Sequence, residues 1–173
     1  MDTYEAISTK LDVREFATRH VDDRLKAKVL EAARLTASSM NSQHWRFIIV
    51  QEAKSLATLA QDSTSGTWVK GSDFAVIVSI DPKIPSSTID AGRVVQDMQL
   101  AAWEEGVASG VFTGIRSQAL RQDFGIPENL NPVIVAGFGY PKRRLLGRKD
   151  RKPLSELAFL EKFGAPLGSI GNS

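Results

Sequence analysis

A run of uncharged polar side chains within residues 35–50 has the composition of a ligand-binding loop. It contains Ser38, Ser39, Asn41, Ser42 and Gln43. Hydroxyl and carboxamide groups donate and accept hydrogen bonds without carrying charge. Such groups suit the rim of a heteroaromatic ring, where donors and acceptors alternate. The alternative is an ordinary polar loop between a helix and a strand, because serine and asparagine are common turn residues.

Positive charge is concentrated near the C-terminus. Residues 142–152 contain seven Lys or Arg and one Asp, a net charge of +6, whereas the rest of the chain contains 15 bases and 19 acids, a net charge of −4. One basic stretch on an acidic body favours a single bound anionic group over a long nucleic-acid track. A solvated run of charge is one alternative. A nucleic-acid-binding tail is another, although few aromatic residues accompany the run for stacking on bases.

Several other chemistries lack the residues that they need. The chain has no cysteine, which excludes a thiol nucleophile, a disulfide framework and a cysteine-ligated metal. The two histidines have no second ligand at metal spacing, and neither a G-x-S-x-G elbow nor a Walker A loop is present. Gly106, Gly110 and Gly114 lie at a spacing of four. These glycines either relieve tight strand ends or let the backbone approach a flat ligand.

Length and composition predict a single domain over residues 1–173. Hydrophobic residues make up 42% and charged residues 24% of the 173, which is typical of a soluble globular protein. The N-terminus has no basic and apolar signal-peptide pattern, and no apolar run approaches the roughly 20 residues that span a bilayer. We therefore expect a cytoplasmic protein without a membrane partner. The last residues, 164–173, are rich in glycine and serine and are predicted to form a loose tail.

Helical and extended patterns alternate along the chain. Apolar periodicity predicts helices over residues 3–10, from an Asp22 cap to about residue 36, and over residues 52–60, 89–105 and 117–124. Apolar runs predict strands at 47–50, 74–80, 107–112 and 133–137. The 47–50 run is continuously apolar, so we expect both its faces to be covered. The 89–105 helix is apolar around most of its circumference, so we expect it to be central and buried, either in the core or in an interface. The alternation indicates an α+β or α/β layer structure.

Three separated segments together resemble the nitroreductase family of FMN-binding flavoenzymes. They are Ser-Ser-x-Asn-x-Gln-x-Trp before an apolar strand, Lys-x-Arg-x-Pro-Leu-x-Glu near the C-terminus, and basic residues near the N-terminus, where the family usually has Arg-Arg-Ser-x-Arg. The resemblance covers roughly residues 8 to 160 and keeps the motifs in order. It implies an α+β, nitroreductase-like fold with a central, mainly antiparallel sheet flanked by helices. It also implies a homodimer with FMN at the subunit interface.

The resemblance implies a role for each matching residue. Lys10, Lys149 and Arg151 would contact the FMN phosphate, and Arg14 would face the pyrimidine edge of the flavin. The serines and asparagine of the polar loop would reach the flavin from the partner subunit, and the backbone of residues 110–114 would approach its ring. The predicted cofactor-binding residues are Lys10, Arg14, Ser38, Ser39, Asn41, Val111, Phe112, Thr113, Gly114, Lys149 and Arg151.

The chain departs from the family pattern at two informative positions. Asp12 stands where the family has a serine that helps to hold the phosphate. An acid beside a dianion is unfavourable, so we expect Asp12 to point elsewhere. His44 replaces the usual proline of Gln-Pro-Trp. Arg14 has an alternative interpretation as half of a surface ion pair with Glu15 or Asp12.

The activity implied by the resemblance is that of a flavin-dependent oxidoreductase of nitroreductase type. FMN would be bound, NADH or NADPH would donate electrons, and a small nitroaromatic, quinone or similar conjugated molecule would accept them by a ping-pong mechanism. Because the flavin is the reactive group, no catalytic side chain and no metal are assigned. The chain shows no long insertion for a lid, which predicts an open pocket and broad acceptor choice. The alternatives are a non-catalytic FMN-binding sensor or store and, less favoured, a nucleic-acid binder.

Overall fold

A four-stranded antiparallel sheet forms the centre of the computed structural model, which describes residues 1–143, 145 and 149–172. Its strands are β1 (Trp45–Val50), β2 (Phe74–Ile80), β3 (Ala108–Phe112) and β4 (Asn131–Gly139). Their order across the sheet is β1-β2-β4-β3, and every pairing is antiparallel. The sheet confirms the predicted fold class.

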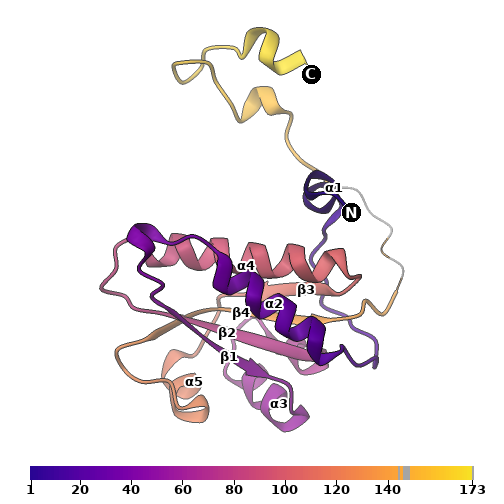
Figure 1. The fold of residues 1–173 in the computed structure, drawn as a ribbon, viewed down its shortest axis with the longest axis vertical. Helices are drawn as coiled ribbons and strands as arrows, with labels where there is room; N and C mark the ends of the chain where they lie inside the picture. Colours follow the sequence, from indigo (N-terminus) through magenta and orange to yellow (C-terminus); the bar gives the residue numbers. More distant parts are fainter. Residues whose placement is uncertain (144, 146–148, 173) are drawn as a thin grey trace.

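Helices cover both faces of this sheet (Figure 1). One face carries α2 (Asp23–Leu35) and α4 (Ser87–Glu104); the other carries α3 (Ala53–Gln61), α5 (Ser117–Phe124) and the 3-10 helix η2 (Thr67–Gly71). Side chains of β2 alternate between the two layers, with Val76 packed on the α2–α4 side and Ile77 on the α3–α5 side. All seven residues of β2 are buried, so this strand lies at the centre of the hydrophobic core.

Local signals set the ends of several helices where the sequence predicts them. The Asp22 side chain accepts a hydrogen bond from the Arg24 amide at 2.8 Å and caps α2. Helix α5 spans the predicted residues and ends at Gly125, which adopts the left-handed conformation with φ 64°. In each case the determinant is one residue at the helix end, which is why the sequence alone predicts the boundary.

One expectation about burial is wrong. Strand β1 lies at the edge of the sheet, and Ile49 is 38% exposed, so its faces are only partly covered. Its continuous apolar run indicates a strand but not the position of that strand in the sheet. Helix α4 buries Ala91, Val94 and Met98 against the sheet and α2, yet Ile89 on the same helix is 70% exposed. One side of the helix therefore packs within this chain, and burial of its other side in an interface stays a prediction.

The N-terminal helix and the start of the C-terminal segment lie close together, and the C-terminus lies farther out (Figure 1). Helix α1 (Thr3–Thr9) lies near the end of α4, and residues 149–172 run past it, away from the sheet, with short 3-10 turns η3 (Leu154–Glu156) and η4 (Gly168–Asn172). This C-terminal arm, residues 149–172, exposes the apolar side chains Leu154, Leu157, Leu160, Phe163 and Ile170. The loose tail over 164–173 stays a prediction, and its Ser173 lies outside the described residues. Within the described ranges, no helix combines the length and apolar character needed to cross a membrane.

Candidate functional site

The segment after α1 is fixed along strand β3. The Val13 amide donates to the Ser109 carbonyl at 2.8 Å, and Asp12 forms a parallel bridge with Ser109. This pairing places Lys10 in a largely buried position, where its side chain is 9% exposed. A lysine so far removed from water needs a negative partner.

The C-terminal basic stretch reaches the same place from the other end of the chain. The Lys149 ammonium donates to the Ile7 carbonyl of α1. Burial lowers the pKa of Lys149, and the positive charges of Arg151 and then Lys10 lower it further. Three cations separated by about 140 residues of sequence therefore share one location, as the resemblance implies. Two further basic residues of the 142–152 stretch, Arg144 and Arg148, lie outside the described residues.

Asp12 does not point away from this cluster, so the expectation for it is wrong. Its Oδ1 lies 2.5 Å from the Lys10 ammonium and also accepts a hydrogen bond from Gln99 Nε2 at 3.3 Å. Gln99 is a buried residue of α4 that donates to the Ser109 hydroxyl as well, at 3.0 Å. The lysine and the amide are the nearest donors, and together they hold the carboxylate among the cations.

Arg14 projects to the surface beside a cavity. Its guanidinium carbon lies 5.9 Å from the ring centroid of Trp68. The ion pair with Glu15 or Asp12 does not form, since Asp12 pairs with Lys10 and Glu15 lies 3.9 Å from Arg143. The cavity beside it has a volume of about 500 Å³. Its lining residues are Asp12, Val13, Arg14, Glu15, Pro141, Arg143 and Leu145.

The glycines of β3 and its continuation make close contacts with protein atoms. A Cβ on Gly110 would lie 2.5 Å from the Val13 carbonyl oxygen, and one on Gly114 would lie 2.4 Å from Thr64 Oγ1. Both glycines are thus explained by tight packing, the first of the two interpretations that the sequence left open. Among their predicted partners in cofactor binding, Phe112 is buried and packs in the α3–α5 layer, whereas Thr113 is exposed.

The polar loop is held by the first turns of helix α4. It contains the 3-10 turn η1 (Ser39–Asn41), and Met40, Asn41 and Gln43 all have positive φ, at 51°, 53° and 45°. The Ser39 amide donates to Asp90 Oδ2 at 3.0 Å, and His44 Nε2 lies 3.3 Å from the same oxygen. Asn41 is exposed, and Ser38 and Ser39 are half-buried. These contacts therefore hold the loop in one defined conformation.

Asp90 is a site residue that the sequence analysis missed. It is 2% exposed and accepts from the Ser39 amide, while Arg93 Nη1 lies 3.3 Å from its second oxygen. One signal could have found it: an acid occurs within the apolar stripe of a buried helix, directly before Ala91. A buried carboxylate needs donors, and the preceding polar loop supplies them.

The cation cluster and the polar loop lie at different ends of α4. The loop contacts Asp90, and the cluster contacts Gln99 through Asp12. Nine residues of α-helix separate the two contacts, which is roughly 13 Å. Within one chain, the two halves of the predicted site therefore do not meet at one point.

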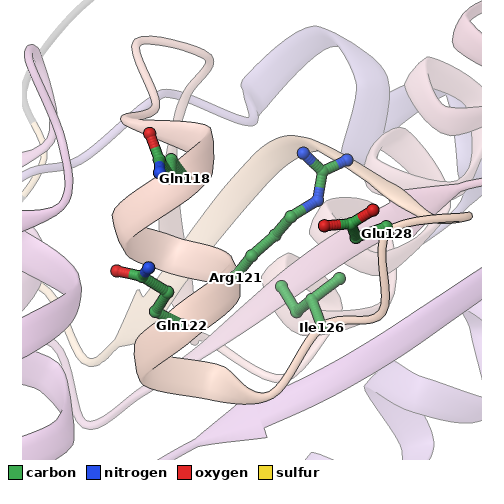
Figure 2. Close-up of a pocket in the computed structure, with 5 residues that line it drawn as sticks. All are labelled: Gln118, Arg121, Gln122, Ile126 and Glu128. Carbon is green, nitrogen blue, oxygen red and sulfur yellow. The ribbon is translucent and has the colours of Figure 1, made fainter.

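Another cavity, of about 560 Å³, lies over α5 and contains none of the predicted site residues (Figure 2). Gln118, Arg121 and Gln122 of α5 line one side, and Ile126 and Glu128 of the following loop line the other. Arg121 already has a hydrogen-bond partner within the chain, because its Nη2 donates to the Leu130 carbonyl at 2.6 Å. This cavity thus lies on the face of the sheet opposite the α2–α4 layer.

The fold and the site define an α+β protein with a cationic cluster that can hold an anionic group beside a surface cavity. The sequence model of the nitroreductase family matches residues 7–84 and 81–140, well over half of the chain. The chain belongs to the nitroreductase family.

Individual relatives agree with this membership. A protein of Methanothermobacter thermautotrophicus, whose assigned name is NADH dehydrogenase/NAD(P)H nitroreductase, is 33% identical over 150 residues, which cover 82% of this chain and 78% of that protein. A nitroreductase family protein of Clostridium difficile 630 is 25% identical, with a TM-score of 0.82 over 94% of this chain and 99% of that one. An FMN-dependent nitroreductase of Clostridium difficile R20291, 20% identical, shares the fold with a TM-score of 0.84 over 93% of this chain and 100% of that one. These relationships confirm the predicted class, a flavin-dependent oxidoreductase of nitroreductase type.

Proposed function

We propose that the protein is an FMN-dependent NAD(P)H oxidoreductase whose acceptors are nitroaromatics, quinones or similar conjugated molecules. The observation that carries the proposal is that Lys149 lies close enough to feel the charges of both the buried Lys10 and the exposed Arg151. Like charges that lie close together repel one another, and an anion bound between them removes this repulsion. A phosphate dianion is an anion of suitable charge, and charge-assisted contacts from Lys and Arg are the strong ones.

The remaining residues suit the rest of such a cofactor. Arg14 stands beside the 500 Å³ cavity, where a positive charge would stabilise negative charge on the pyrimidine edge of a flavin. Trp68 Nε1, under Arg14, is buried without a hydrogen-bond partner in the described part of the chain. When bound, FMN would supply the two-electron chemistry that couples NADH or NADPH oxidation to acceptor reduction in a ping-pong sequence. The protein would bind and orient the cofactor, and no side chain is assigned as an acid or base.

A homodimer would complete the site. The loop that presents Ser38, Ser39 and Asn41 lies at the opposite end of α4 from the cation cluster, so a second chain is the natural source of one half. The C-terminal arm leaves the body of the chain with Phe163 93% exposed and Ile170 61% exposed. Apolar surface of this kind favours burial against a partner. Sedimentation equilibrium should give twice the chain mass, and a monomer that binds FMN with full affinity would contradict this part of the proposal.

The test of the activity is optical. The purified protein, reconstituted with FMN, should show a flavin absorption band that bleaches on anaerobic addition of NADH or NADPH and returns on addition of a quinone or nitroaromatic. A band that never bleaches would support the alternative of a sensor or store. A protein that retains no flavin and binds nucleic acid with steep salt dependence would favour the remaining alternative. A cytoplasmic location stays a prediction.

A further inference from the structure

At the proposed phosphate site, the Lys10 ammonium already has a negatively charged partner, the Asp12 carboxylate. The two charged atoms are 2.5 Å apart, with the lysine side chain 9% exposed and the aspartate side chain 56% exposed. Lys10 is therefore the buried member of the pair and Asp12 the member open to solvent. An incoming anion that binds the ammonium has to share it with, or take it from, a carboxylate that is already there.

Asp12 is held in this position by more than its lysine. Gln99 Nε2 donates to Oδ1 of Asp12 at 3.3 Å, and the same amide donates to Ser109 Oγ at 3.0 Å. The backbone of Asp12 bridges to Ser109, and the next amide, that of Val13, donates to the Ser109 carbonyl at 2.8 Å. The backbone of Asp12 is thus fixed on β3, and its carboxylate cannot swing far from the cluster without breaking its contacts to Lys10 and to Gln99 of α4.

Asp12 also acts on the rest of the cluster. Its negative charge opposes the effect of burial, Arg151 and Lys10 on the pKa of Lys149. The three cations thus face one fixed carboxylate before any ligand arrives. A phosphate dianion gains the attraction of the cations but meets the repulsion of this carboxylate, whereas an uncharged ribityl end meets neither.

We propose that Asp12 competes with the cofactor phosphate for Lys10 and so limits how strongly the site prefers a phosphorylated flavin to an unphosphorylated one. The inference rests on the proposed function. Asp12 would then be a specificity-determining residue that keeps FMN exchangeable.

The experiment compares FMN and riboflavin binding to the cofactor-free protein by quenching of flavin fluorescence. Asp12→Asn keeps the size of the side chain and an oxygen for Gln99 but removes the charge. We expect the Kd for FMN to fall on the order of fivefold, the scale of a partly exposed charge contact, and the Kd for riboflavin to stay within about twofold. Asp12→Ser should act in the same direction, and it provides a second variant if Asp12→Asn folds poorly.

Two controls isolate the mechanism. Glu31→Gln removes an exposed charge on α2 that pairs with Arg34 and does not line the cavity, and it should leave both constants unchanged. In a Lys10→Met background, Asp12→Asn should tighten FMN binding much less, because the contested cation is gone. If Asp12→Asn tightened FMN binding equally in the Lys10→Met background, the proposed competition for Lys10 would be wrong.

The outcomes separate this inference from the proposed function. Wild-type protein that binds neither flavin would defeat the proposed function itself. Wild-type protein that binds FMN, together with an Asp12→Asn variant that binds it equally or more weakly, would defeat only the role of Asp12. A gain for FMN and riboflavin alike would also defeat it, because the phosphate would not be the group affected.

Discussion

The buried carboxylate of Asp90 accepts a hydrogen bond from the Ser39 amide at 3.0 Å and so joins helix α4 to the polar loop. The loop needs such an anchor. Met40, Asn41 and Gln43 have positive φ, a backbone region that costs non-glycine residues free energy and persists only where surrounding contacts enforce it. Asp90 and His44 supply those contacts, which makes the loop a preformed part of the proposed flavin site.

Asp90→Asn should lower the free energy of unfolding by about 1–3 kcal/mol, because the Ser39 amide loses a charged acceptor in a buried place. Denaturant unfolding would measure the loss. Glu104→Gln on the same helix is the matched control, since its ion pair with Lys28 is 45% exposed on both sides and should contribute less than about 1 kcal/mol. Equal stability of Asp90→Asn and wild type would contradict the anchoring role.

The same carboxylate should make stability depend on acid. The hydrogen bond from the Ser39 amide lowers the pKa of Asp90, with His44 and Arg93 adding to the effect against the opposing influence of burial. A lowered pKa in the folded state gives stability that is complete above the ordinary value of about 3.9 and is lost as the pH falls below it. Unfolding measured between pH 7 and pH 3 should show the gap between wild type and Asp90→Asn closing towards pH 3. A gap that stays constant with pH would contradict the ionised acceptor.

Asp62 should have the opposite pH dependence. Its side chain is buried, and burial raises its pKa, with the charge of Asp123 adding to the effect. A raised pKa means that the protonated form favours folding, so stability is complete below the ordinary carboxyl value and is lost as the pH rises through the folded-state value. Asp62→Asn should therefore stabilise the protein by about 0.5–1 kcal/mol at pH 7 and have little effect near pH 3. Thermal melts at the two pH values would measure the effect, and the exposed Glu128→Gln is the control that should change stability little at either pH. A stabilisation by Asp62→Asn that is as large at pH 3 as at pH 7 would contradict the raised pKa.

Gly110→Ala tests the contact between the N-terminal segment and β3. The new Cβ would lie 2.5 Å from the Val13 carbonyl oxygen and 2.9 Å from the Trp68 ring, so we expect a loss of about 1–3 kcal/mol in the free energy of unfolding. Gly92→Ala in α4 is the matched control, because nothing lies within 4 Å of its Cβ position. Alanine is the better helix former, so that variant should gain about 0.5–1 kcal/mol. Two variants of similar stability would contradict the close packing.

Arg151→Ala should weaken FMN binding about tenfold, or about 1.4 kcal/mol, and leave riboflavin binding nearly unchanged, because only FMN carries the phosphate. Equilibrium fluorescence titration of the cofactor-free protein measures both constants. Lys152→Ala is the control, since its side chain is 72% exposed and approaches Glu156 rather than the cluster. Equal effects of the two substitutions on FMN would indicate general charge attraction instead of a phosphate site.

The sequence predicts those elements whose determinants are local. Helix α5 begins and ends where its pattern and Gly125 place it, and β2 spans the seven apolar residues from Phe74 to Ile80. The polar loop and the basic stretch also stand out, because composition alone marks them. Strand β1 shows the limit: its apolar run marks a strand, but its neighbours in the sheet decide that Ile49 is left partly exposed.

The amino-acid order alone predicted the family, because its motifs lie within short segments, and the resemblance in turn implied the antiparallel α+β class and the candidate cofactor-binding residues. Only the tertiary structure decided the contact of Asp12 with Gln99 and of Asp90 with Ser39. Ser39 and Asp90 are 51 positions apart, and Gln99 reaches Asp12 across 87. Such contacts depend on how helices pack on a sheet, and side chains so distant in sequence leave no local pattern that announces their meeting.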